Sequence, residues 1–188
     1  MTAYSKRRRF HAGRRALEAI HIDGPVCQRP PCCHLVVGVD AHPGIHPALA
    51  FAIGFARQLN AELHVVHSID LADYPIEPDS PRYEHEFAET LESERARTCA
   101  TLASFGGPWS YELSPEDPVR LLTATANACD AVMIVIGTPR RGITSIIERI
   151  SGESVLAHLI HHTHRPLLMI PDSAAFPGQP ASPPASAP

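Results

Sequence analysis

The sequence predicts an α/β protein in which a five-stranded parallel sheet lies between two layers of helices. One observation is an unbroken apolar run at residues 132–136, rich in β-branched residues, which is typical of a strand covered on both faces. A second is that strand-like runs alternate with segments whose apolar residues have helical spacing. A third is that every connection is long enough for a right-handed parallel crossover. Together these features predict a three-layer α/β/α sandwich.

The first strand–helix–strand unit begins where the apolar pattern begins. Residues 34–40 (HLVVGVD) form the first predicted strand. The helix after it has Pro43 and Pro47 in its first turns, where proline is well tolerated, and it ends at Asn60. Residues 61–68 form the second strand, so the unit predicts two parallel neighbours.

The middle of the chain predicts a connecting loop, a long helix and a third strand. Residues 71–81 contain three prolines and form the loop. The helix runs from about residue 83 to residue 105 and stops at the glycine pair 106–107. A short strand follows at residues 108–113.

The last part of the domain predicts two helices and two strands. Either Ser114 or Glu116 caps the first of these helices. The apolar run described above then ends at Gly137, and a Gly/Pro/Arg-rich turn leads into the last helix. Residues 166–170 complete the sheet as its fifth strand.

The predicted strand order is 3-2-1-4-5, a Rossmann-like arrangement with the first and fourth strands side by side at the centre. Ligands of such sheets bind beyond the carboxyl ends of the strands, where the strand order reverses and helix N-termini attract anions. Asp40 ends the first strand and Gly137 ends the fourth. We therefore expect these two residues to face each other across one crevice.

Composition divides the chain into three regions. Residues 1–33 carry seven basic and two acidic side chains and little that can be buried, which predicts a disordered extension. Residues 34–171 form the folded domain, since 188 residues with 44% hydrophobic content support one core. Residues 172–188 are rich in Pro, Ala and Ser and predict a disordered tail.

Charge and cysteine content restrict the partners and the compartment. The net charge of -4 gives no sign of a nucleic-acid-binding protein, and we expect the basic extension to be solvated rather than bound to nucleic acid or a membrane. No apolar run approaches membrane-spanning length. Five cysteines without framework spacing predict a reduced, cytoplasmic protein.

Two histidine pairs have a spacing that suits a shared metal ion. His42 and His46 lie at a helix start, and His158 and His162 lie four apart in the last helix. Neither pair is completed by a carboxylate or a thiol, so we expect exposed helix histidines and no metal site.

Several motifs in residues 34–171 resemble those of a single universal stress protein domain, a member of the adenine-nucleotide α-hydrolase-like group. They are VVGVD at 36–40, ELHVVHSID at 62–70, EDP at 116–118, VMIVIGT at 132–138 and SVLAHLIHHTHRPLLMIP at 154–171. The resemblance covers about three quarters of the chain. It implies the α/β fold predicted above and a nucleotide site at the switch point.

ATP-binding members of this family carry a glycine, two residues, a second glycine, nine residues, and then glycine with serine or threonine. Gly137 matches the first glycine, whereas Arg140 stands at the second. The loop is three residues longer than the pattern, and Glu153 precedes Ser154 where the family has its last glycine, with Gly152 one place early. Arginines in this loop can supply the charge that glycine amides usually provide.

The resemblance implies the residues that contact ATP, with Mg²⁺ bound to the nucleotide. On the adenosine side they are Val39, Asp40, Ser68 and Ile136; on the phosphate side they are Gly137, Thr138, Arg140, Gly142, Ser154 and Val155. Structural roles compete with these assignments. Asp40 and Ser154 are equally suited to capping a helix, and Arg140 is better suited to a solvated loop than to a phosphate contact.

Three functions remain open. The first is a stress-response module that binds ATP or a related adenine nucleotide and acts through dimer or partner contacts. The second is a family member that binds no nucleotide and serves as a protein-interaction scaffold. The third is a nucleotide-hydrolysing enzyme; because no nucleophile with a nearby base is evident, we expect at most weak ATPase activity.

A homodimer is expected from the sheet edge. Leu167–Ile170 is apolar and lies at the predicted edge, where its unpaired backbone groups need a partner. The resemblance implies that a second copy pairs with this strand across a two-fold axis.

Overall fold

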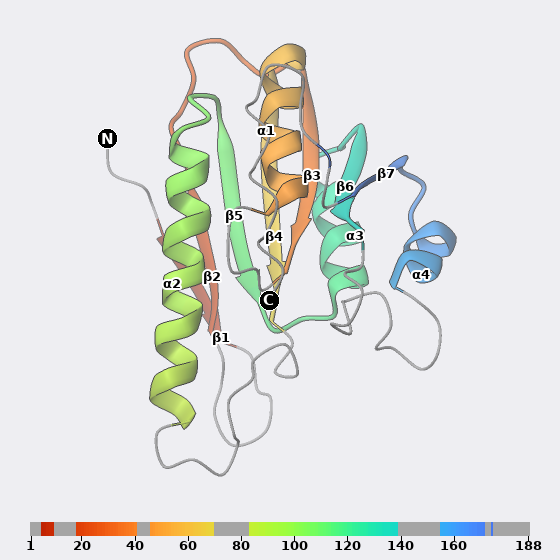
Figure 1. The fold of residues 1–188 in the computed structure, drawn as a ribbon. Helices are drawn as coiled ribbons and strands as arrows, with labels where there is room; N and C mark the ends of the chain where they lie inside the picture. The colour runs from red at the N-terminus through yellow and green to blue at the C-terminus, as the bar shows by residue number, and fades with distance from the viewer. Residues whose placement is uncertain are drawn as a thin grey trace.

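In a computed structural model of the chain, the structure describes residues 5–9, 18–40, 46–69, 83–138, 155–171 and 174. These residues form one sheet with helices on both faces (Figure 1). The strands are β1 (Ser5–Arg9), β2 (Glu18–Asp23), β3 (Cys33–Val39), β4 (Ala61–Ser68), β5 (Trp109–Ser114), β6 (Met133–Gly137) and β7 (Leu167–Ile170). The helices are α1 (Pro47–Leu59), α2 (Tyr83–Ala103), α3 (Pro118–Ala128) and α4 (Val155–His162).

The five predicted parallel strands are all present, as β3 to β7. Within the sheet order β1-β2-β5-β4-β3-β6-β7, these five follow the predicted 3-2-1-4-5 arrangement. The central strand β3 pairs in parallel with β4 on one side and with β6 on the other, so that Leu35 lies opposite both Leu63 and Met133. The α/β fold with a mostly parallel sheet is therefore confirmed.

The predicted strand count of five is wrong, because two N-terminal strands extend the sheet to seven. Residues 1–33 were expected to lie outside the domain, yet β2 pairs antiparallel with β5 and β1 pairs antiparallel with β2. Ala19 and Ile22 are buried. The physical reason is that β5 would otherwise present an unpaired apolar edge, and the segment EAIHID can cover that edge.

Gly24 follows β2 and is held tightly against the sheet. Its backbone N–H donates to the carbonyl oxygen of Trp109 at 2.7 Å. A Cβ at this position would lie 2.5 Å from the indole ring of Trp109, so only glycine fits here without displacing the ring. This contact joins the N-terminal segment to β5.

The two faces of the sheet have separate apolar cores. Because side chains alternate along a strand, Leu35 and Val37 of β3 pack on one face with residues of α1 and α2. Val36 of β3 packs on the other face with Leu122 of α3 and Leu159 of α4. These side chains are fully or almost fully buried, and each stabilises the fold by roughly 1.5–3 kcal/mol.

The helix ends follow local sequence signals. Helix α1 starts at Pro47 and is capped at its C-terminus by Asn60, whose φ of 50° is left-handed. Helix α3 is capped by Asp117, whose side chain accepts a hydrogen bond from the N–H of Arg120 at 2.9 Å. The prediction of Ser114 or Glu116 as this cap is therefore wrong. In the described part of the chain, no helix has the length and apolar character needed to cross a membrane.

Candidate functional site

The carboxyl ends of β3 and β6 lie side by side at the centre of the sheet. Val37 lies opposite Val135 in this parallel pair, so that two residues further on Val39 reaches the level of Gly137. Helix α1 follows β3 on one face, whereas α4 follows β6 on the other (Figure 1). This divergence of the two connections is the switch point at which α/β sheets bind ligands.

His46 connects Asp40 with Gly137 across this point. Its Nε2 lies 2.8 Å from Oδ1 of Asp40, and its side chain is 10% exposed while that of Asp40 is 33% exposed. A Cβ at Gly137 would lie 3.2 Å from Cε1 of His46. The structure thus brings Asp40 and Gly137 together through the imidazole ring.

Both earlier interpretations of this histidine and its partner need correction. His46 was interpreted as an exposed helix histidine, but it is largely buried and is the N-cap residue of α1. Asp40 was offered as a cap for the same helix, but the N-cap residue is His46, whose side chain makes no capping bond. Asp40 bonds to the imidazole ring of this N-cap residue. His42 lies outside the described residues.

The buried imidazole of His67 lies on β4, next to the end of β3 that precedes Asp40. His67 is opposite Val39 in the β3–β4 pair and is 1% exposed. Its Nδ1 lies 3.0 Å from the hydroxyl oxygen of Tyr111, and its Nε2 lies 3.9 Å from a carboxylate oxygen of Glu94. Burial lowers the pKa of His67 to about 4, although the charge of Asp40 acts in the opposite direction. His67 is therefore neutral at pH 7.

The remaining predicted residues on the adenosine side are well buried. Val39 is 4% exposed and Ile136 is 7% exposed, so they can offer a ligand only a small apolar surface. Ser68 donates its hydroxyl proton to the carbonyl oxygen of Glu116 at 2.7 Å. This bond ties the end of β4 to the loop before α3 and leaves Ser68 Oγ able to act only as an acceptor for a ligand.

Of the residues predicted on the phosphate side, the structure describes Gly137, Thr138 and the backbone of Val155. The backbone N–H of Thr138 donates to the carbonyl oxygen of Ile170 at 2.9 Å, which continues the β6–β7 pairing and commits this amide. Arg140, Gly142 and Ser154 lie outside the described residues. Val155 is the first residue of α4, and its side chain is also outside the described part.

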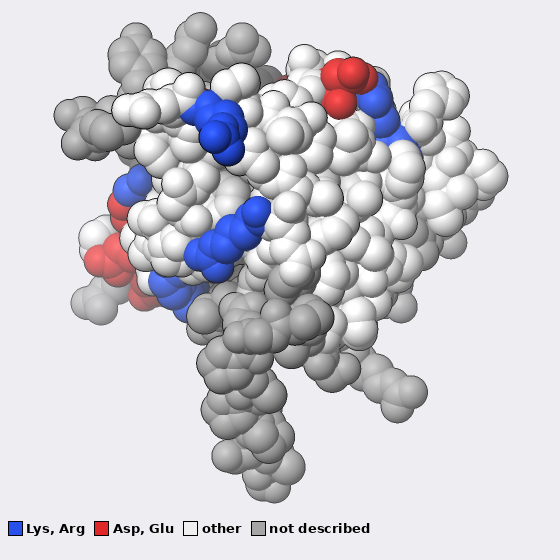
Figure 2. Space-filling view, turned by 90° about the horizontal axis from the view of Figure 1, so that it is seen from above, with Lys and Arg blue, Asp and Glu red and all other residues white. Residues whose placement is uncertain are grey.

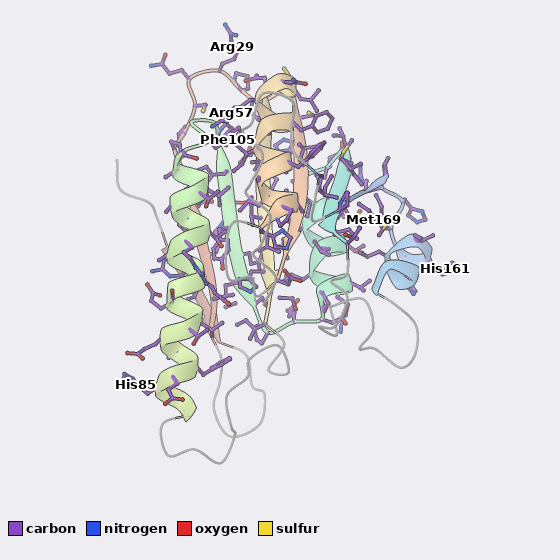
Figure 3. All side chains as sticks on the ribbon, in the orientation of Figure 1. Arg29, Arg57, His85, Phe105, His161 and Met169 are labelled. Atoms are coloured by element: carbon purple, nitrogen blue, oxygen red, sulfur yellow. The ribbon has the colours of Figure 1, made fainter. Side chains whose placement is uncertain are left out.

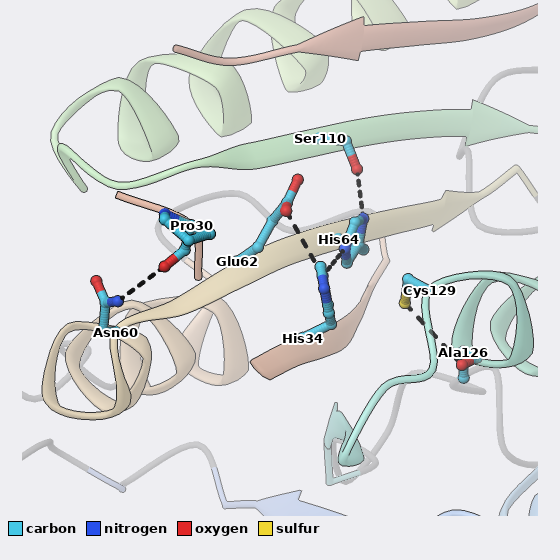
Figure 4. Close-up of polar contacts among 8 residues, drawn as sticks. All are labelled: Pro30, His34, Asn60, Glu62, His64, Ser110, Ala126 and Cys129. Carbon is cyan, nitrogen blue, oxygen red and sulfur yellow. Dashed lines mark hydrogen bonds and ion pairs between the residues drawn. The ribbon is translucent and has the colours of Figure 1, made fainter. Parts of the chain in front are cut away.

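A second polar cluster, formed by His34, Glu62 and His64, lies near the opposite ends of β3 and β4 (Figure 4). His34 Nδ1 lies 3.0 Å from His64 Nε2 and 3.5 Å from Oε2 of Glu62. His64 Nδ1 lies 2.9 Å from Oγ of Ser110 on β5. Burial, followed by the proximity of His34, lowers the pKa of His64 to about 4.

This cluster was not predicted from the sequence. The available signal was the Glu-x-His spacing in β4, which places Glu62 and His64 on the same face of a strand. The third member, His34, can be found only when the register of β3 against β4 is known.

Two surface features of the described residues remain. A hollow of about 570 Å³ lies along α3 and is lined by residues including Arg120, Thr123 and His162. At the end of the molecule where the parallel strands begin, the described basic side chains are separated, without a continuous basic surface (Figure 2).

Comparison with known proteins identifies the relatives of this fold. A family model described as the universal stress protein family matches residues 33–171. No curated protein sequence matches the chain.

Solved structures with the same fold include two of similar length to the domain. A universal stress protein family member from Burkholderia pseudomallei is 24% identical, with 74% of this chain and 96% of that chain covered and a TM-score of 0.51. UspA from Lactobacillus plantarum is 17% identical, with 76% and 99% covered and a TM-score of 0.52. A universal stress protein from Archaeoglobus fulgidus in complex with dAMP is 24% identical, with 73% and 97% covered and a TM-score of 0.47.

Proposed function

Since this chain belongs to the universal stress protein family, we propose that it binds an adenine nucleotide between the ends of β3 and β6. The proposed role is a stress-response module that acts through contacts with a second copy or another partner. The observation that carries the nucleotide proposal is the position of the Asp40 carboxylate, one third exposed at the switch point and adjacent to Gly137 through His46. A carboxylate placed there can accept hydrogen bonds from ribose hydroxyls or from an adenine amino group.

His46 supports this role by orienting the carboxylate. Its Nε2 lies 2.8 Å from Oδ1 of Asp40. Each carboxylate oxygen has two lone pairs and can accept more than one hydrogen bond. Gly137 leaves the space beside the ring open, because a side chain there would press against His46.

The phosphates would be held by the loop after β6 and by the N-terminus of α4. Because the amide of Thr138 already bonds to Ile170, we assign the phosphate contacts to later residues, namely Arg140, Gly142, Ser154 and Val155. The guanidinium of Arg140 would offset the negative charge of the phosphates where the family has glycine. ATP with Mg²⁺ is the proposed ligand, with affinity reduced by the altered glycine pattern.

Two alternatives remain. The contact of His46 with Gly137 favours a scaffold without nucleotide, because the ring occupies part of the space that a ligand needs. Hydrolysis is the weaker alternative; we propose at most a weak ATPase activity. The free thiols of all five cysteines suit a reducing compartment, and we propose a cytoplasmic location.

Titration calorimetry with ATP and with AMP at fixed Mg²⁺ tests the proposal. A saturable signal that Gly137→Val abolishes is expected, since valine would displace His46 and close the crevice. Thermal unfolding of the variant shows whether it remains folded. Absence of binding at millimolar nucleotide would refute the proposal and favour the scaffold.

We also propose a homodimer through β7, which pairs in the described part of the sheet only with β6. Leu167, Leu168 and Met169 are half-buried, which leaves apolar surface at this edge. Pairing of two β7 strands would satisfy the edge backbone and cover this surface.

A further inference from the structure

We propose that His34, Glu62 and His64 form a binding site for a divalent transition-metal ion, for which Zn²⁺ is the probe. Imidazole nitrogens and a carboxylate oxygen are the donors that such ions prefer, whereas Mg²⁺ and Ca²⁺ prefer oxygen donors alone. The site is separate from the nucleotide crevice, because it lies near the beginnings of β3 and β4 rather than at their ends.

The sheet itself assembles the three ligands. Glu62 and His64 are two residues apart on β4, so both side chains project from the same face. His34 lies directly opposite Glu62 in the parallel β3–β4 register. Residues on two paired strands have well-defined separations, so the ligands lie on a rigid part of the fold.

The distances within the cluster are close to those that a bound ion requires. His34 Nδ1 is 3.0 Å from His64 Nε2 and 3.5 Å from Oε2 of Glu62. With metal–ligand bonds of about 2.0–2.2 Å, two ligand atoms of a tetrahedral site lie roughly 3.3–3.5 Å apart. Small side-chain rotations would therefore bring all three atoms to one ion.

The number of N–H protons on the two imidazoles supports an ion at this position. Each neutral imidazole carries one N–H, and with the His64 proton on Nδ1 this group donates to Oγ of Ser110. His64 Nε2 then presents a lone pair toward His34 and Glu62. Ser110 is a positioning residue that orients the ring, as hydrogen-bond partners of metal-bound histidines commonly do. Any single proton on His34 Nδ1 must then serve two acceptors, whereas an ion would bind all three groups.

Solvent can reach the site, which an exchangeable ion needs. The side chain of His34 is 32% exposed and that of Glu62 is 26% exposed. Three protein ligands leave at least one coordination position for water or for a group from another molecule. A bound ion would also connect β3 to β4 where both strands begin.

The test is a Zn²⁺ titration of chelator-stripped, full-length protein in competition with a chromophoric chelator. One tight equivalent is expected, and Glu62→Gln should weaken it at least tenfold while keeping the shape of the side chain. His34→Ala should have a similar or larger effect, and Ser110→Ala a smaller one. If His34→Ala fails to fold, the Zn²⁺ affinity of Glu62→Gln decides whether the proposal stands.

The matched control is His85→Ala. His85 lies near the beginning of α2, and its Nε2 is 3.3 Å from Oε1 of Glu89, so it is also a His–Glu pair, but one that is 75% and 67% exposed (Figure 3). This variant should keep the wild-type affinity. Equal affinities in wild type and Glu62→Gln would overturn the proposal, and so would a thiolate charge-transfer band on loading with Co²⁺, because it would place the ion on cysteine.

Thermal unfolding gives an independent measurement. At a Zn²⁺ concentration about one hundred times the Kd, the wild type should unfold several degrees higher, and Glu62→Gln should show no such shift. Nucleotide binding by the metal-free protein should be unchanged. The metal proposal and the nucleotide proposal can therefore fail separately.

Discussion

Nε2 of His46 lies 2.8 Å from Oδ1 of Asp40, so the N-cap residue of α1 is bonded to the residue that follows β3. The same ring lies 3.2 Å from the position that a Cβ on Gly137 would occupy. The imidazole is therefore shared between the carboxylate proposed to bind a nucleotide and the glycine proposed to make room for it. A change at any of the three residues should affect the other two.

Asp40→Asn should weaken nucleotide binding about tenfold, or by about 1.4 kcal/mol, because a hydrogen bond to a charged acceptor becomes one to a neutral acceptor. Calorimetry with AMP measures this loss without a contribution from the outer phosphates. Asp23→Asn is the matched control, since Asp23 also bonds to a histidine, His21 Nε2, at 2.9 Å but lies away from the crevice. Equal losses in both variants would argue against a ligand at Asp40.

Protonation of His67 should destabilise the protein in mild acid. The pKa of His67 falls from 6.5 to about 4 on folding, so the unfolded chain binds a proton that the folded chain does not. Stability is therefore fully present above pH 6.5 and is lost as the pH falls toward 4, with a slope of about 1.4 kcal/mol per pH unit. Asp40, His46, Glu94 and Tyr111 face or act on this ring.

Urea unfolding of metal-free protein at several pH values between 4.5 and 7 measures this slope. His67→Gln should reduce this slope by about 1.4 kcal/mol per pH unit, which is the contribution of one proton. Glutamine can bond to the Tyr111 hydroxyl, but it does not titrate. His64 also has a pKa lowered to about 4, so part of the slope should remain. An unchanged slope in His67→Gln would contradict the prediction.

Met169→Pro should prevent dimer formation with little effect on the folded protomer. The carbonyl oxygens of Pro166 and Ile170 accept hydrogen bonds from the N–H groups of Ile134 and Thr138. Along a strand, the backbone N–H and C=O groups of successive residues point alternately to its two sides, so those of residues 167 and 169 point away from β6. Met169 lies on β7 at the edge of the sheet (Figure 3), where proline removes an outward N–H and part of the packing of a half-buried side chain.

Sedimentation velocity at tens of micromolar, a typical range for modest interfaces, measures the outcome. Leu168→Pro is the contrasting variant, because it removes an N–H directed at β6 and should cost about 3 kcal/mol of stability. A wild-type protein that remains monomeric in this range would refute the dimer.

Ile22→Asp tests whether β2 belongs to the folded domain. Ile22 is 7% exposed and lies opposite Tyr111, so an aspartate there should lower the free energy of unfolding by roughly 2–4 kcal/mol. Val26→Asp provides the control, since Val26 is 87% exposed and its change should be within about 0.5 kcal/mol. Equal stabilities of the two variants would show that β2 does not stabilise the domain.

Local signals predicted the elements well. The predicted run 132–136 corresponds to β6 at Met133–Gly137, although Val132 is 42% exposed and precedes the strand. Asn60 caps the end of α1 as expected. A buried apolar run and a left-handed residue can both be recognised in a short stretch of sequence. The cap of α3 was misplaced because three polar residues stand before Pro118, and only the backbone geometry shows that Asp117 is the one that bonds.

The features that were missed depend on long-range pairing. Covering β5 with β2 requires residues about 90 positions apart to find one register, and the basic composition around EAIHID concealed its alternation. His46 is buried only because β3 and β6 end beside each other. The His34–Glu62–His64 cluster likewise depends on a register that no local pattern specifies.

The two borders of the described sheet are formed by different parts of the chain. Strand β1 lies at one border, and β7, with the uncharged sequence LLMI, lies at the other. Pairing of copies through both borders would extend the sheet without limit. Pairing through β7 alone stops once two copies have met, so the proposed contact would give a closed dimer.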